Sequence, residues 1–130
     1  MTSEFGGFRG QTHNRGRGRV GEEAAVRWLV AQGYEIVRRN LVNHGGEIDV
    51  IARDGDTLCF VEIKARSSTD YGPAIAAVGF AKQRKISRAA ALYLAIEGCA
   101  APCRFDVLGL DLQGDGEGDG WRFTLIRDAF

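Results

Sequence analysis

The stretch GEIDVIARDGDTLCFVEIKAR, residues 46–66, decides the fold of this chain. Two runs rich in β-branched and aromatic residues, 46–52 and 57–64, flank the turn signal Asp54-Gly55, which predicts an antiparallel β-hairpin. Side chains on a strand alternate between the two faces of a sheet. One face of the first strand is therefore expected to carry an apolar set, namely Ile48, Val50 and Ala52.

The charged residues of the hairpin are expected together on the opposite face. They are Glu47, Asp49, Glu62 and Lys64. Two registers of the strands stay open, one with Asp49 opposite Phe60 and the other with Asp49 opposite Glu62. In both registers the alternation keeps the charged side chains on one shared face.

Three carboxylates on one face need a compensating cation, because like charges that oppose each other in a sheet are destabilising. Lys64 is one candidate and a divalent cation is the other. Mg²⁺ takes oxygen ligands, so Asp49, Glu62 and the backbone carbonyl between Glu62 and Lys64 could form its site. Lys64 would then lie within reach of a bound water, which it could position or help to deprotonate. The alternative is a network of surface ion pairs on a half-exposed strand.

The rest of the chain predicts one α/β domain, in which a mixed sheet of about five strands is flanked by helices. Helical spacing or strand-like alternation marks the other elements: helices over 20–32 and 81–97, a short helical turn over 73–79, and strands over 34–40, 103–112 and 121–126. The expected order is helix, three strands, helix, two strands. Residues 1–17, rich in Gly and Arg, are expected to form a mobile tail before a single domain that spans 18–130.

Both predicted helices carry charged residues that a core does not explain. Glu22 falls beside the apolar face of the first helix, where a carboxylate needs a partner, whereas Glu23 points away. The start of the second helix is strongly basic and carries Lys82, Gln83, Arg84, Lys85 and Arg88. Such residues bind the phosphate backbone of a nucleic acid without reading its sequence. The alternative is an ordinary solvated helix surface.

The overall composition indicates the cellular compartment of the protein but not the class of its partner. The net charge is zero, from 17 basic and 17 acidic residues, so total charge indicates no class of partner. The 3 cysteines, without a secretory signal, fit reduced thiols in a cytoplasm. No apolar run is long enough to predict a membrane span.

The spacing of the hairpin charges resembles a known nuclease signature. Asp49, Glu62 and Lys64 follow the pattern of the PD-(D/E)xK nuclease superfamily, and the Glu22 helix resembles the N-terminal acidic helix of archaeal-type Holliday-junction resolvases. From about Gly18 onward the chain is similar to the YraN family of small bacterial proteins. The stretches that carry this resemblance are GEEAAVRWLVAQGYEIVRRN, GGEIDVIARDGDTLCFVEIKARSS, YGPAIAAV, KQRKISRAAALYL, RFDVLGL and LIRDAF.

The resemblance implies a restriction-endonuclease-like core and an endonuclease that hydrolyses phosphodiester bonds with Mg²⁺ or Mn²⁺. Asp49 and Glu62 would be metal ligands, Lys64 the catalytic lysine, and Glu22 an outer carboxylate that completes the metal site. Glu47 lies outside the signature and would support the site or bind a second metal. DNA is favoured as the substrate by the resemblance alone, and cutting two strands would require a homodimer.

Two other classes of function stay open. One is a non-catalytic nucleic-acid-binding protein that retains the nuclease fold. The other is a protein-interaction module whose acidic hairpin docks a basic partner.

Overall fold

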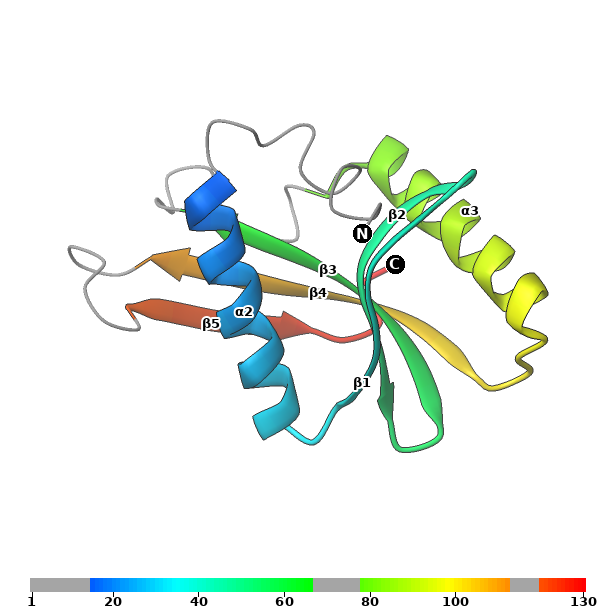
Figure 1. Cartoon of the computed structure of the whole chain (residues 1–130), viewed down its shortest axis with the longest axis horizontal. Helices are drawn as coiled ribbons and strands as arrows, with labels where there is room; N and C mark the ends of the chain where they lie inside the picture. Colours follow the sequence, from blue (N-terminus) through cyan, green and yellow to red (C-terminus); the bar gives the residue numbers. More distant parts are fainter. Residues whose placement is uncertain (1–14, 67–77, 113–119) are drawn as a thin grey trace.

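The computed structural model of the chain describes residues 15–66, 78–112 and 120–130. They form one mixed five-stranded sheet with a helix packed on each face (Figure 1). In chain order the elements are α2 (Arg15–Ala31), β1 (Glu35–Asn43), β2 (Gly46–Asp54), β3 (Thr57–Arg66), α3 (Phe80–Glu97), β4 (Cys103–Leu112) and β5 (Trp121–Ile126). The expected order of helices and strands, and the α/β class, are confirmed.

The strands lie in the order β1-β2-β3-β4-β5, which is also their order in the sequence. Neighbouring strands are antiparallel except for β3 and β4, which are parallel. A parallel pair needs a long crossover, and α3 lies within it. This arrangement is the one expected of a restriction-endonuclease-like core.

Two apolar layers hold the helices on the sheet. The layer under α2 is built from Ala25, Leu29, Val50, Ala52, Val61, Leu108 and Leu110. The layer under α3 is built from Ile48, Ile51, Leu58, Phe60, Ile86, Ala89, Ala90 and Val107. Because alternate residues of β2 and β3 enter opposite layers, the central hairpin is the common wall of both cores.

The turn of the central hairpin lies one residue later than predicted. Asp54 pairs with Thr57, so the two turn residues are Gly55 and Asp56. Gly55 has a φ of 64°, and a two-residue hairpin turn with glycine in its first position accepts this conformation without strain. The ladder selects the second of the two predicted registers, and its last pair is Val50 with Val61.

The expected placement of Ile48 is wrong. It packs in the layer under α3, whereas Val50 lies in the layer under α2. The cause is the tip of the β1–β2 hairpin, which lies directly on α3: a Cβ at Gly45 would come within 2.7 Å of the helix backbone. The side-chain amide of Asn43 also donates to the carbonyl of Ala89 at 3.1 Å. Strand β2 therefore twists away from β3 before Val50 and turns Ile48 toward the helix.

Helix α2 begins earlier than predicted, at Arg15, and α3 begins at Phe80. Gly98 ends α3 in the left-handed conformation, and its N–H donates to the carbonyl of Leu94 at 2.9 Å. Residues 1–14 of the expected tail, and most of the expected turn over 73–79, lie outside the described residues. Neither helix in the described part of the chain is long and apolar enough to cross a membrane.

Candidate active site

Asp49 lies where β2 and β3 separate. The ladder between these strands ends at Val50 and Val61. Beyond it, Oδ2 of Asp49 accepts a hydrogen bond of 2.8 Å from the backbone N–H of Ile63. The carboxylate thus satisfies a strand donor that lies past the last backbone pair, and this bond fixes Asp49 beside Glu62.

Glu62 is a nearly buried carboxylate with an acidic neighbour. Its side chain is 7% exposed, and Nζ of Lys82 lies 3.2 Å from its Oε2. Burial, together with the charge of Asp49, raises the pKa of Glu62 to about 8, although the ammonium of Lys82 opposes the increase. Burial also raises the pKa of Asp49. One lysine therefore does not offset the cost of burying both carboxylates in their charged forms.

Glu22 approaches the pair from α2, which covers the other face of the sheet. Burial and the charge of Asp49 raise the pKa of Glu22, and the guanidinium of Arg39 acts against them. Nη2 of Arg39 lies 3.8 Å from Glu22 and donates a 2.9 Å hydrogen bond to the exposed Glu23. The predicted difference between Glu22 and Glu23 is confirmed, and Glu22 belongs to the electrostatic environment of Asp49.

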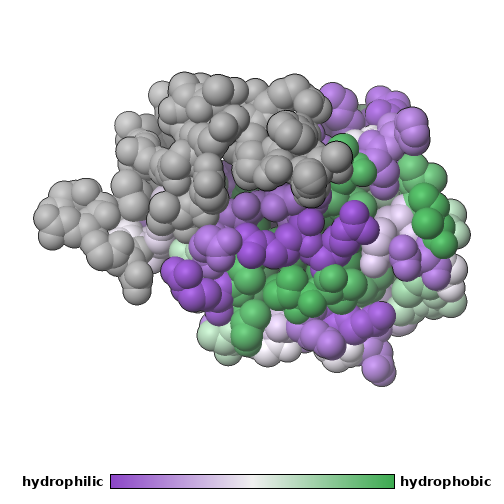
Figure 2. Space-filling view, viewed as in Figure 1, coloured by the Kyte–Doolittle hydropathy of each residue, from purple (hydrophilic) through white to green (hydrophobic). Residues whose placement is uncertain are grey.

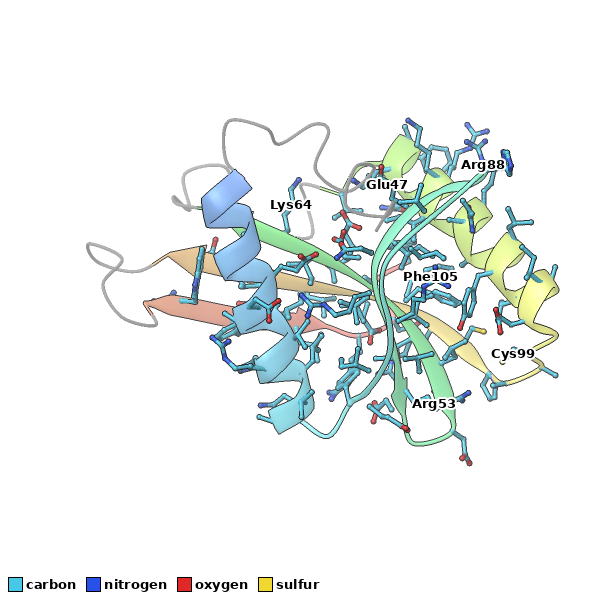
Figure 3. All side chains as sticks on the ribbon, viewed as in Figure 1. Glu47, Arg53, Lys64, Arg88, Cys99 and Phe105 are labelled. Atoms are coloured by element: carbon cyan, nitrogen blue, oxygen red, sulfur yellow. The ribbon has the colours of Figure 1, made fainter. Side chains whose placement is uncertain are left out.

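Lys64 and Glu47 lie at the same end of the sheet, whereas Arg53 marks the opposite end (Figure 3). Both residues are half-buried. Lys64 stands beside Gly109 of β4 in the parallel ladder. Glu47 is near enough to Lys82 for its charge to contribute to the raised pKa of that lysine, which burial opposes. Figure 2 shows a band of hydrophilic residues across the middle of the molecule in the same view.

The donor set fits a hard divalent cation with few protein ligands. Asp49 and Glu62 supply carboxylate oxygens at one point, and burial raises the pKa of both, so a cation there would stabilise their charged forms. Among residues 15–66, 78–112 and 120–130, no group of three or more acidic, histidine or cysteine side chains is gathered closely enough to hold a metal unaided. Two carboxylates, with water and a substrate phosphate in the remaining positions, suit Mg²⁺ or Mn²⁺. Glu22 is then a more distant carboxylate.

The five predicted phosphate-binding residues of α3 have different surroundings. Lys82 contacts Glu62, and the amide of Gln83 donates to the carbonyl of Val78 at 2.9 Å. The other three are exposed, namely Arg84, Lys85 and Arg88. Figure 3 shows Arg88 beside the tip of the β1–β2 hairpin. A basic surface thus begins at the carboxylates and continues along the helix.

Two residues near the site escaped the sequence-based reasoning. Phe80, the first residue of α3, is 74% exposed beside the basic run. An aromatic residue directly ahead of four cations was the available signal, but the predicted helix began one residue later. The other is Arg39 of β1, which contacts Glu22 of α2. No local pattern in the sequence indicates that these two elements pack together.

Known sequences match this chain over most of its length. The model of the uncharacterised protein family UPF0102 matches residues 21–110. A UPF0102 protein of Chlorobium chlorochromatii is 48% identical over 115 residues, which cover 87% of this chain and 89% of the relative. A UPF0102 protein of Symbiobacterium thermophilum is 47% identical over 114 residues, with 87% and 94% covered. The range matched by the family contains all the residues of the candidate site.

Proposed function

Because the chain belongs to the UPF0102 family, also called the YraN family, and places the nearly buried Glu62 beside the half-buried Asp49, we propose that it is a metal-dependent nuclease. Its reaction is the hydrolysis of phosphodiester bonds in nucleic acid, with DNA favoured by the resemblance of its signature. One site cuts one strand, so cleavage of both strands of a duplex or junction would use two copies of the chain.

Asp49 and Glu62 would hold the cation, together with the backbone carbonyl between Glu62 and Lys64. A bound Mg²⁺ or Mn²⁺ would supply Lewis-acid chemistry at the phosphate and at the attacking water. Lys64 lies at the same end of the sheet and positions that water or stabilises the charge that develops on the phosphate. Glu22 would add negative charge to the site from the α2 side.

Lys82 has two partners in this proposal. It contacts Glu62 at 3.2 Å, and its side chain is half-exposed at the start of the basic surface. There it would also bind a backbone phosphate beside the scissile bond, more freely once a cation at the carboxylate pair competes with its contact to Glu62. The exposed Arg84, Lys85 and Arg88 extend that contact along α3.

The observation that carries the proposal is the placement of the nearly buried carboxylate of Glu62 beside that of Asp49, where burial and the charge of Asp49 raise the pKa of Glu62 to about 8. A surface ion-pair network would leave such carboxylates in solvent, where their pKa values stay ordinary. Burying two of them together costs stability and is explained by a site for a cation.

The test is cleavage of end-labelled single-stranded, duplex, flap and four-way-junction DNA, and of an RNA strand, with Mn²⁺ or with EDTA. Cleavage should require Mn²⁺ and should be lost in Asp49→Asn and in Lys64→Ala. The amide oxygen introduced by Asp49→Asn still accepts from Ile63 N–H, so this change removes charge and spares the strand contact. Asp56→Asn, in the turn at the far end of the same hairpin, is the matched control and should cut normally.

Absence of cleavage on every substrate, with binding that neither variant alters, would reject the nuclease and favour the non-catalytic binding protein. A binding protein of this kind should still show affinity that falls steeply with salt. Absence of any affinity for nucleic acid would favour the protein-interaction module instead.

A further inference from the structure

Phe80 is a large aromatic side chain that the fold leaves in solvent. It is 74% exposed at the first position of α3. The guanidinium of Arg84, one turn further along, lies over its ring at 5.9 Å from the ring centroid. The arrangement fixes one side of the ring beside a cation and leaves most of the ring open.

The surroundings of Phe80 indicate the charge of what it contacts. Between Phe80 and Ile96 the helix contains Lys82, Arg84, Lys85 and Arg88 and no acidic residue. Ile96, at the other end of α3, is similarly exposed at 69%, but no cation of α3 lies within two turns of it. Phe80 therefore differs from ordinary surface apolar residues by its basic environment, which suits a polyanion with flat apolar groups.

Phe80 is also close to the candidate site. It precedes Lys82 by two residues, and Lys82 reaches Glu62 at 3.2 Å. Residues two apart on a helix point to different sides, so the ring of Phe80 lies on the side of Arg84 and not on that of Lys82. A strand that runs from Lys82 to Arg84 across the first turn of α3 would therefore bring a base to the ring of Phe80.

We propose that Phe80 and Arg84 form a stacking platform for an unpaired base of a strand that crosses the first turn of α3 on its way from the site. The substrate class is then nucleic acid with a single-stranded segment beside the cleavage point, such as a single strand, a flap or an open junction. Bases of a continuous duplex are already stacked on each other and cannot occupy the platform. This inference rests on nucleic acid being the substrate, but not on the chain being able to cut it.

The experiment measures binding in EDTA, so that cleavage does not interfere. A single strand and a duplex of the same sequence, each with one 2-aminopurine, are titrated with wild type, Phe80→Ala, Phe80→Trp and the control Ile96→Ala. We expect Phe80→Ala to weaken single-strand binding about tenfold and to abolish the quenching of 2-aminopurine that stacking causes. Phe80→Trp should keep both, Ile96→Ala should change neither, and duplex binding should change little in any variant.

Equal losses for single strand and duplex in Phe80→Ala, or no loss for either, would overturn the platform. Binding of wild type to vesicles of equal parts phosphatidylcholine and phosphatidylserine, lost in Phe80→Ala while single-strand binding persists, would instead assign Phe80 to a membrane surface. A parallel cleavage assay in Mn²⁺ separates the two proposals. Quenching of 2-aminopurine without cleavage of any substrate would support the stacking platform and reject the nuclease. Cleavage that Phe80→Ala leaves unchanged on every substrate would support the nuclease and reject the platform.

Discussion

The ammonium of Lys82 lies 3.2 Å from Oε2 of Glu62, so a side chain from α3 neutralises a carboxylate of the central hairpin. The contact joins the two halves of the candidate site, since Glu62 belongs to the carboxylate pair and Lys82 begins the basic surface. A change in the charge of Glu62 should therefore alter both the stability of the protein and the position of Lys82 on the basic surface.

Replacing Lys82 by Met should destabilise the protein above pH 8, where Glu62 is ionised, when no divalent cation is present. The change removes the charge that offsets Glu62 and leaves a nearly buried carboxylate without its partner. The expected loss is about 1–3 kcal/mol in the free energy of unfolding, measured by urea denaturation in EDTA. With saturating Mn²⁺ the loss should shrink, because the cation takes over the compensation. Lys85→Met, on the exposed part of the same helix, should change neither value much; a loss that Mn²⁺ leaves undiminished would contradict the prediction.

The free energy of unfolding should fall as the pH rises from about 4.5 to about 8. The pKa of Glu62 is about 8 in the folded protein and 4.5 in its ordinary state. Below pH 4.5 both states hold the proton, so this contribution to stability is fully present. Between the two pKa values only the unfolded state releases its proton, and stability is lost, in total on the order of 5 kcal/mol.

Urea denaturation across this pH range should show the fall in wild type in EDTA, with Asp49, whose pKa is also raised, adding to it. Glu62→Gln should flatten most of the slope and should be the more stable protein above pH 8. Glu97→Gln, at the exposed end of α3, serves as the control for removing one acidic group. An equally steep slope in Glu62→Gln would show that other groups cause it.

Gly45→Ala should destabilise the fold and disturb the site at a distance. The added Cβ would lie 2.7 Å from the backbone of Arg88 and Ala89, and a helix backbone cannot give way as a flexible side chain does. We expect a cost of about 1–3 kcal/mol in unfolding free energy. Because Gly45 is at the tip of the β1–β2 hairpin and Asp49 lies on β2, Mn²⁺ binding measured by calorimetry should weaken too. Gly79→Ala is the matched control, since its Cβ would meet nothing within 4 Å, and an effect as large there would point to glycine itself rather than to this contact.

Arg104→Met should lower stability without altering the chemistry. Asp106 is fully buried and accepts hydrogen bonds from Arg104 Nε at 2.9 Å and from the hydroxyl of Tyr34 at 3.0 Å. Removing Arg104 leaves that carboxylate short of its cation, at an expected cost of about 3–5 kcal/mol. Since this network lies at the end of the sheet away from Lys64, cleavage per folded molecule should match wild type. Arg127 is half-exposed and lies 3.7 Å from Asp54, so Arg127→Met should lower the free energy of unfolding far less. If Arg104→Met lowered the specific activity together with the stability, the two ends of the sheet would not be independent.

The order of the elements was predictable because its signals are local. The alternation in β2 and β3, the spacing in α3 and the glycine after it can each be recognised within a few residues. The turn was misplaced by one position because Asp54-Gly55 and Gly55-Asp56 both fit a two-residue hairpin turn. The twist that moves Ile48 into the α3 layer was not predictable, because it arises from Gly45 meeting a helix more than 40 residues later in the chain.

The candidate site also has a part that local sequence patterns predict and a part that only the tertiary structure shows. The grouping of Asp49, Glu62 and Lys64 follows from alternation and spacing, and the structure brings Asp49 and Glu62 together. The contact of Lys82 with Glu62 required the position of α3 on the sheet, and so did the exposure of Phe80. Strand and helix periods describe the faces of single elements, and they do not give the distances between those faces.

The bond from Ile63 N–H to Asp49 bears on how this protein could diverge. The carboxylate of Asp49 accepts a hydrogen bond where β2 and β3 separate, and it also belongs to the candidate site. Most replacements of Asp49 would therefore leave the N–H of Ile63 without an acceptor, even in a descendant without catalytic activity. Lys64 has no comparable duty in the framework of the sheet. A lineage that abandons catalysis but keeps the fold should therefore lose Lys64 early, while an oxygen acceptor, Asp or Asn, persists at position 49 long after the activity has gone.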